Sequence, residues 1–270
     1  MKKLFALILA ALMLFTMAAC GGTADNETTT AAPDDAAAAN SDLAYIKDKG
    51  TLIVGITDYA PMDFKDENGE WTGFDAEFAR LAGESLGVAV EFIEIDWDNK
   101  FLELKGKTID CIWNGMTITD EALANAAVSN PYVKNAQVVV MAADKLADYA
   151  TVESLADLQF AAEAGSAGEA AINENGLNCT SVLTQADALQ EVKSGAADAC
   201  VIDITMANAM TGEGTSYAGL GYSLELTTEE YGIACRQGSD LADALNDIMA
   251  NLKADGTLQD LAEKYELTLA

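Results

Sequence analysis

Hydrophobic and polar positions along the chain predict an alternation of strands and helices. Short apolar runs rich in β-branched residues predict buried strands at 51–56, 88–95 and 109–114. Apolar residues at helical spacing predict a helix that ends at Gly87, and they are Phe74, Phe78, Leu81 and Ala82. A shorter helix is expected over 99–105. This strand–helix–strand–helix–strand order predicts a parallel sheet with right-handed crossovers.

The same order of elements recurs in the second half of the chain. Strands are expected at 158–163, 178–184 and 197–203, with helical segments between them. The segment KGKTIDCIWNG (105–115) also aligns with KSGAADACVID (193–203). Each has a lysine, a turn, an aspartate and then a buried strand that ends in a polar residue. The repeat predicts two similar α/β lobes.

Two further extended segments, 136–143 and 229–236, lie at the ends of the two halves, and two helices follow Ser239. If those helices pack on the first lobe, the chain crosses between the lobes twice, and two strands form a hinge. The expected first lobe is 43–134 plus 232–270, and the expected second lobe is 135–231.

The polar residues that end the central strands indicate where a ligand would bind. Ligands of open α/β sheets bind beyond the carboxyl ends of the strands. In this sequence those ends carry Asn114, Gly115 and Asp203. We therefore expect a central cleft between the lobes, with these residues facing it.

The N-terminal segment predicts export. Lys2 and Lys3 precede an apolar run that is too short for a confident membrane span, so residues 1–19 are expected to be a secretory signal peptide. Cys20 directly follows two alanines, which resembles a bacterial lipobox and predicts that Cys20 is lipidated. The alternative is an ordinary signal with an unrelated cysteine. Residues 20–42 would then be the lipidated cysteine and a flexible tether, because the segment holds no large apolar residue.

Composition argues against several functions and sites. A net charge of -29 argues against binding to nucleic acid or to anionic lipid, so the N-terminal lipid is the expected membrane contact, at the outer face of the cell membrane. The chain has no histidine and no CxxC motif, which argues against a zinc-type site and removes the commonest general base. We expect no metal, no cofactor and no catalysis. No feature indicates oligomerisation, so a monomer is expected.

Four further cysteines lie in strand-like apolar runs: Cys111, Cys179, Cys200 and Cys235. Buried thiols are the simplest interpretation. Export permits disulfides, however, and a bridge between Cys111 and Cys235 remains open at this point.

Seven segments together carry a resemblance to a known family: GTLIVGITDYAPMDF, NGEWTGFDAEFARLAGESLGV, VEFIEIDWDN, IDCIWNGMTITDE, SNPY, EYGIACRQGSDL and LKADGTLQDLAEKY. Over residues 43–268 the chain resembles the amino-acid-binding family of bacterial solute-binding proteins, the extracytoplasmic receptors of ABC importers. The resemblance implies a fold like that of type II periplasmic binding proteins. It also implies capture of a small polar solute, an amino acid or close analogue, by lobe closure, and delivery to an ABC transporter permease.

The resemblance also implies ligand contacts from the first lobe. Tyr59 matches the aromatic that packs over the ligand. Gly115 and Thr117, in the loop after Asn114, match positions that offer backbone and hydroxyl groups to the ligand's α-carboxylate and α-amino groups. Two alternatives remain: Tyr59 could pack on its own lobe, and Asn114 could hold the loop instead of contacting ligand.

From the second lobe, the resemblance implies amide groups at a helix start, matched by Ser166, Ala167 and Gly168. A helix N-terminus favours an anion. Asp203 matches the acid that pairs with the α-ammonium group. Ser166 and Asp203 could instead only cap helices.

One position departs from the family pattern. After TITDE the family usually carries an arginine that clamps the ligand carboxylate, and here that position is Ala122. Lys100, at the edge of the expected cleft, could supply the missing charge. Alternatively, Lys100 is a solvated helix lysine. A third possibility is a ligand without a carboxylate, in which case Asp58, Asp98 and Asp203 would face a cation.

Two other functions fit the same scaffold. One is a ligand-sensing lipoprotein that contacts a membrane receptor instead of a permease. The other is a cleft enzyme similar to cyclohexadienyl dehydratase, which would need the carboxylate clamp that Ala122 lacks.

Overall fold

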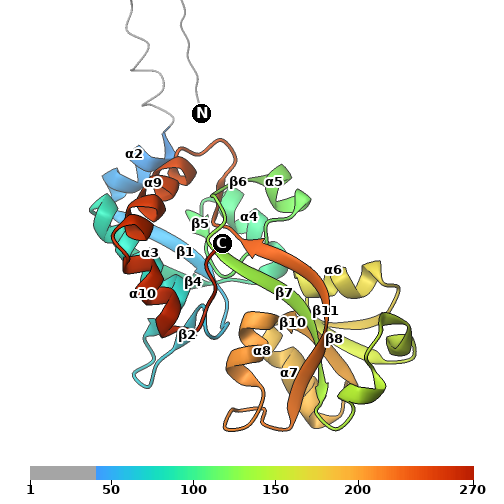
Figure 1. Cartoon of the computed structure of the whole chain (residues 1–270). Helices are drawn as coiled ribbons and strands as arrows, with labels where there is room; N and C mark the ends of the chain where they lie inside the picture. Colours follow the sequence, from blue (N-terminus) through green and yellow to red (C-terminus); the bar gives the residue numbers. More distant parts are fainter. Residues whose placement is uncertain (1–40) are drawn as a thin grey trace, which may run out of the picture.

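The computed structural model describes residues 41–270 as two α/β lobes, each built on a five-stranded sheet (Figure 1). The predicted signal peptide (1–19), the lipidation at Cys20 and nearly all of the tether (20–42) lie outside the described residues. Within the described part of the chain, no helix is both long and apolar enough to cross a membrane.

The first sheet has the strand order β4-β1-β5-β12-β6. Its strands are β1 (Thr51–Ile56), β4 (Ala89–Glu94), β5 (Cys111–Ile112), β6 (Ala126–Val128) and β12 (Ala234–Arg236). β1 runs parallel to β4 and β5, whereas β12 runs antiparallel to β5 and β6. The helices of this lobe are α2 (Asp42–Lys49), α3 (Phe74–Leu86), α4 (Lys100–Gly106), α5 (Asp120–Asn125), α9 (Leu241–Ala254) and α10 (Thr257–Lys264), with a 3-10 turn η1 (Trp97–Asn99) and a small hairpin of β2 (Phe64–Lys65) and β3 (Trp71–Thr72).

The second sheet has the strand order β11-β7-β10-β8-β9. Its strands are β7 (Val133–Ala142), β8 (Gln159–Glu163), β9 (Asn178–Val182), β10 (Ala199–Asp203) and β11 (Leu220–Tyr231). β8 runs parallel to β9 and β10, and β7 runs antiparallel to β10 and β11. The helices are α6 (Ala167–Glu174), α7 (Gln185–Ser194) and α8 (Ile204–Met210), with 3-10 turns η2 (Leu146–Asp148) and η3 (Val152–Leu155).

The two sheets are built in the same way. β1 pairs in parallel with β4 and β5 in the first sheet, as β8 does with β9 and β10 in the second. Two strands that pair antiparallel with each other complete each sheet, β12 with β6 in the first and β7 with β11 in the second. The aligned segments 105–115 and 193–203 contain β5 and β10, which occupy equivalent places in the two sheets. The prediction of two similar lobes is therefore confirmed.

Two long strands connect the lobes. β7 and β11 pair antiparallel along nearly their whole length, and in Figure 1 they run from the first lobe into the second. At their first-lobe ends, Val133 pairs with Leu269 and Tyr231 pairs with Thr117. The expected boundaries of 43–134 with 232–270, and of 135–231, fall at the ends of these strands, and we retain them as a proposal.

The extended segment expected over 229–236 is two strands, not one. β11 ends at Tyr231 and β12 begins at Ala234, so the chain changes sheets between them. Gly232 lies at this crossing, where a Cβ atom would come within 2.7 Å of Val128 and 2.9 Å of Ile118. The lack of a side chain at Gly232 therefore permits the close approach.

Cys111 and Cys235 lie opposite each other on β5 and β12. Both are fully buried free thiols, as is Cys200 in the second lobe, whereas Cys179 is partly exposed. The sequence left open whether Cys111 and Cys235 are buried thiols or form a disulfide bridge, and in the structure they are buried thiols.

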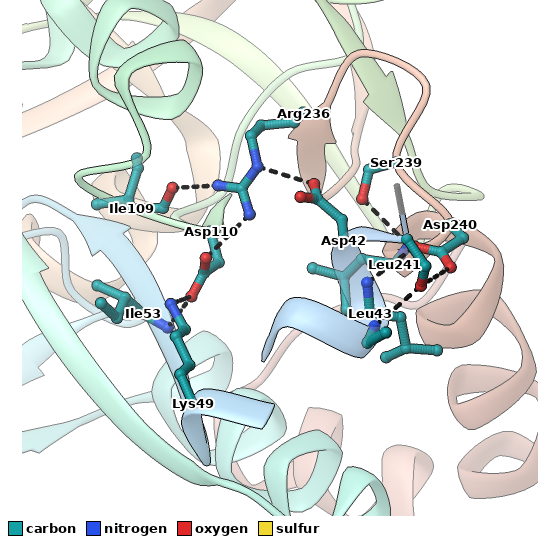
Figure 2. A network of polar contacts seen from close by, with 12 residues as sticks. Asp42, Leu43, Lys49, Ile53, Ile109, Asp110, Arg236, Ser239, Asp240 and Leu241 are labelled. Atoms are coloured by element: carbon teal, nitrogen blue, oxygen red, sulfur yellow. Dashed lines mark hydrogen bonds and ion pairs between the residues drawn. The ribbon is translucent and has the colours of Figure 1, made fainter. Parts of the chain in front are cut away.

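A network of ion pairs fixes the start of the described chain to the first lobe (Figure 2). The guanidinium group of Arg236 donates to Asp42 at 2.8 Å and to Asp110 at 3.0 Å, and Asp110 also pairs with Lys49. Next to this network, Asp240 accepts hydrogen bonds from the Ser41 hydroxyl and the Leu43 amide. Helix α2 is therefore held against β12 and the start of α9.

Candidate functional site

A cavity of about 360 Å³ lies between the two lobes. The first lobe contributes Tyr59, α4 and the segment 114–122, and the second contributes the ends of β8 and β10 with the start of α6. Its volume lies at the lower end of the range for small-molecule sites. The cleft expected at the carboxyl ends of the strands is therefore present, and it has the size of a small solute.

The loop after β5 forms one wall, but its first residues are held from within the lobe. The Asn114 side-chain oxygen accepts from the amide and hydroxyl of Thr57, and its nitrogen donates to Asp63 at 2.8 Å. The Gly115 amide donates to Asp75 at 2.6 Å. Both residues line the cavity, yet these groups fix the loop, which agrees with the alternative role expected for Asn114.

Beneath this loop lie two buried carboxyl groups, Asp63 and Asp75. Burial raises the pKa of Asp75 to about 7 and the pKa of Asp63 well above its ordinary value. Each carboxyl group accepts one bond from the loop and retains one buried oxygen without a partner among residues 41–270. The two carboxyl groups therefore support the loop, and burial favours their protonated forms.

Tyr59 reaches from the first lobe towards the second. Its hydroxyl shares hydrogen bonds with the hydroxyls of Thr205 on α8 and Tyr231 on β11. Gly115 allows this position, because a Cβ atom on it would lie 2.5 Å from the Tyr59 ring. Tyr59 lines the cavity, and the alternative that it packs only on its own lobe is wrong.

Lys100 also crosses the cleft. Its ammonium group donates to the backbone carbonyl of Trp97 at 3.1 Å and to that of Gly165, in the second lobe, at 2.9 Å. The side chain is buried and lines the cavity, so the alternative of a solvated helix lysine is wrong. Burial lowers the Lys100 pKa, which nearby carboxylates, Glu121 foremost, counteract. Ala122 lies in the same wall, buried and without charge.

Thr117 lines the cavity, but its hydroxyl donates to Glu229 on β11 at 2.8 Å. Ser166 is the N-cap of α6, and its side chain accepts from the Glu169 amide at 3.1 Å. The amides of Ala167 and Gly168 begin the helix, where N–H groups have no intrahelical acceptor.

Gly168 has a packing role that its sequence position did not indicate. A Cβ atom there would lie 2.6 Å from the carbonyl oxygen of Val201 and 3.0 Å from the amide oxygen of Gln137. Helix α6 therefore approaches the sheet closely at this residue. Its neighbours Ser166 and Ala167 line the cavity, whereas Gly168 lies behind it.

Asp203 ends β10 in the wall of the cavity. One carboxylate oxygen accepts from the amides of Asn135 and Gln137, and the other accepts from Gln185. Burial, followed by the charge of Glu229, raises its pKa to about 7. Asp203 occupies the N-cap position of α8, as the capping alternative expected, but its side chain makes no capping hydrogen bond.

Glu163 is a cavity residue that the sequence reasoning missed. It ends β8, lines the cavity and is buried, and burial raises its pKa to about 8. The signal was present, since an acid closes the otherwise apolar strand just before a glycine turn, as Asp203 closes β10. By contrast, Asp58 and Asp98, named for a cationic ligand, are exposed and do not line the cavity.

Comparisons with known proteins agree with this architecture. The L-cystine-binding protein TcyJ of Escherichia coli (strain K12) is 30% identical over 227 residues, which cover 82% of this chain and 84% of that protein. The arginine-binding extracellular protein ArtP of Bacillus subtilis (strain 168) is 28% identical, with 98% of each chain covered. The crystal structure of the ancestral amino acid-binding protein AncCDT-1, a precursor of cyclohexadienyl dehydratase, superposes with a TM-score of 0.77 at 34% identity, covering 83% of this chain and 99% of that one.

Residues 52–268 match the family described as bacterial extracellular solute-binding proteins, family 3, which is nearly the whole described chain. The two-lobed fold, the hinge of two strands and the cavity between the lobes agree with that match. The chain therefore belongs to the family 3 bacterial extracellular solute-binding proteins.

Proposed function

We propose that this protein is an extracytoplasmic receptor that captures an amino acid or close analogue between its lobes and delivers it to an ABC importer. One observation carries the proposal: the cavity is walled by both lobes and holds buried groups of both charges, Lys100 on one side and Asp203 on the other. An α-amino acid carries the complementary pair, a carboxylate and an ammonium group. The cystine-binding and arginine-binding relatives support this ligand class.

Closure of the lobes is the functional event in this proposal. Lys100 and Tyr59 of the first lobe already contact Gly165 and Thr205 of the second. A ligand that touches both walls is bound fully only when the lobes are together, so it stabilises the closed state. The importer would then recognise the closed form.

The carboxylate of the ligand would be met without the arginine that Ala122 replaces. Lys100 uses two of its three donors on backbone carbonyls, which leaves one N–H for a ligand. Helix α6 begins at Ala167, two residues after the Gly165 carbonyl that accepts from Lys100, and its N-terminus favours an anion through the helix dipole. Together these groups replace one bidentate clamp by several weaker contacts.

Other parts of the proposal rest on the sequence and the family. The relatives are named as binding proteins, and we propose binding without catalysis for this chain. The family is extracellular, and Cys20 is the proposed point of lipid attachment at the outer face of the membrane. The proposed partner is an ABC transporter permease, and the proposed state is a monomer.

A thermal-shift screen tests the proposal. The chain of residues 21–270, which lacks Cys20 and the signal peptide, is heated with each of the twenty amino acids and with a set of amines that lack a carboxylate. A ligand that binds only the folded state raises the melting temperature by mass action. A rise with at least one α-amino acid supports the proposal. A rise with amines alone, or with none of these solutes, would overturn it.

A further inference from the structure

Three charged side chains are buried in the wall of the cavity: Lys100, Glu163 and Asp203, with 7%, 3% and 4% of their surface exposed. The other acids that line the cavity, Asp120, Glu121 and Glu174, are exposed to solvent. Water screens exposed charges more than buried ones, so the three buried groups contribute most to the field inside the cavity.

These three groups differ in how well the protein satisfies them. Lys100 donates to two backbone carbonyls, and Asp203 accepts from three side-chain amides. Glu163 has no comparable support, because its Oε1 atom is buried without a hydrogen-bond partner among residues 41–270. Among those residues, Lys100 forms no ion pair with either acid. Glu163 is therefore the group in the wall that most needs a partner.

The charge balance shows what kind of partner would satisfy it. With all three groups ionised, two carboxylates face one ammonium group, which leaves one negative charge in excess. A zwitterionic amino acid with a neutral side chain brings no net charge, so it offers the Glu163 carboxylate no cationic partner. A ligand with one additional positive group cancels it, and a buried carboxylate is stable only when it is paired and hydrogen-bonded.

We propose that Glu163 is a specificity-determining residue that receives a positively charged side-chain group of the ligand, so that the receptor selects cationic amino acids over neutral ones of the same shape. The inference rests on the proposed function, because it assumes that Lys100 and Asp203 meet the α-carboxylate and α-ammonium groups. Glu163, on β8, then binds the charged side-chain group of the ligand.

Isothermal titration calorimetry with isosteric pairs tests the inference on residues 21–270. L-arginine is compared with L-citrulline, whose ureido group has the shape of a guanidinium group without its charge, and L-lysine is compared with L-norleucine. The wild-type chain should bind at least one cationic member about tenfold or more tightly than its neutral partner, as expected for a charge-assisted hydrogen bond. Glu163→Gln should remove that preference by lowering the affinity for the cationic ligand. The affinity for the neutral ligand should change less than about threefold.

Asp157→Asn is the matched control. Asp157 is an exposed acid just before the other end of β8, so its substitution changes the net charge equally without touching the cavity. The control should keep the wild-type preference.

The outcomes separate this inference from the proposed function. Binding of neutral amino acids without a preference for cationic ones would overturn the role of Glu163 and leave the proposed function intact. A preference that persists in Glu163→Gln would also overturn it. Binding of no amino acid would overturn the proposed function itself. The preference of the wild-type chain is informative even if Glu163→Gln folds poorly, which circular dichroism would reveal.

Discussion

The ammonium group of Lys100 and the backbone carbonyl of Gly165 form a hydrogen bond of 2.9 Å across the cleft, between a helix of the first lobe and a turn of the second. Lys100 lines the cavity as well, so the same side chain joins the lobes and borders the proposed ligand site. We therefore expect closure of the lobes and ligand binding to be linked through Lys100.

Replacing Lys100 by methionine should weaken amino-acid binding about tenfold or more. Methionine retains an unbranched apolar side chain, but it loses both the bond to Gly165 and the third N–H that we propose binds the ligand. Calorimetric titration of the ligand found in the thermal-shift screen measures the effect. Lys105→Met, an exposed position on the same helix, is the control and should bind normally. Equal affinity in the two variants would contradict this role of Lys100.

Substituting Gly165 by alanine should hinder closure. A Cβ atom on Gly165 would lie 2.8 Å from the Asp98 carboxylate and 3.0 Å from the Asp98 Cα atom of the first lobe. Ligand should then reduce the radius of gyration less than in the wild type, measured by small-angle X-ray scattering, and the affinity should fall. Gly176→Ala is a close control, since Gly176 has φ +67° against +68° for Gly165 but nothing within 4 Å of a Cβ. If both variants close normally, Gly165 does not limit the approach of the lobes.

Removal of Arg236 should destabilise the first lobe. Arg236→Met leaves Asp42 without its partner and removes one of the two cations bonded to the buried Asp110, and breaking a buried ion pair by removing one partner costs roughly 3–5 kcal/mol. Urea unfolding at pH 7 measures this loss. Lys65→Met, which breaks the exposed pair with Glu94, should cost less than about 1 kcal/mol. Similar losses in the two variants would contradict a structural role for the network.

The unliganded protein should lose stability as the pH rises from about 5 to about 8. Burial raises the pKa of Glu163 from 4.5 to about 8, with contributions from Asp203, Asp187 and Asp96 that Lys100 opposes. The folded state thus retains a proton that the unfolded state has released, and stability falls by up to about 1.4 kcal/mol per pH unit for such a group.

Urea unfolding at several pH values in this window tests that linkage. Glu163→Gln should show a smaller loss of stability with pH than the wild type. Part of the slope should remain, because Asp75 and Asp203 have pKa values raised to about 7. An unchanged slope in Glu163→Gln would mean that this carboxyl group titrates normally.

A thiol reagent should modify one cysteine of the folded chain from residue 21 onwards. Cys179 is partly exposed, whereas Cys111, Cys200 and Cys235 are fully buried. Burial raises the pKa of all four thiols, so exposure decides which of them a reagent can reach. Thiolate is the reactive form, so the buried three should react only after unfolding. Counting modified cysteines by mass spectrometry with and without denaturant measures this. Failure of Cys111 and Cys235 to react in denaturant without reductant would instead indicate a bridge between them.

Much of the fold could be predicted because buried strands have a local sequence signal, a short apolar run rich in β-branched residues. The run 51–56 became β1 with the same bounds, and the polar ends of β5 and β10 did reach a shared cleft. The predicted strand at 109–114 is shorter, only Cys111–Ile112, because Trp113 and Asn114 already belong to the loop that turns into the cavity.

The candidate site was less predictable, because its contacts depend on residues far apart in the sequence. Local pattern could not show that the hydroxyl of Thr117 is bonded to Glu229, or that Gly168 packs against Val201 behind the cavity. Nor could it show that Glu163 lacks a hydrogen-bond partner for one oxygen, since that follows from the positions of every neighbouring donor. Lys100 was a candidate from sequence, but only the second lobe supplies the carbonyl that holds it.

The bonds of Ser41, Asp42 and Leu43 to Asp240 and Arg236 determine how the molecule would carry a mechanical load (Figures 1 and 2). Tension applied at residue 41 passes through α2 into α9 and β12, all within the first lobe. The two connecting strands, β7 and β11, lie outside that path. We therefore expect a pull at residue 41 to load the first lobe and not the two strands that join it to the second.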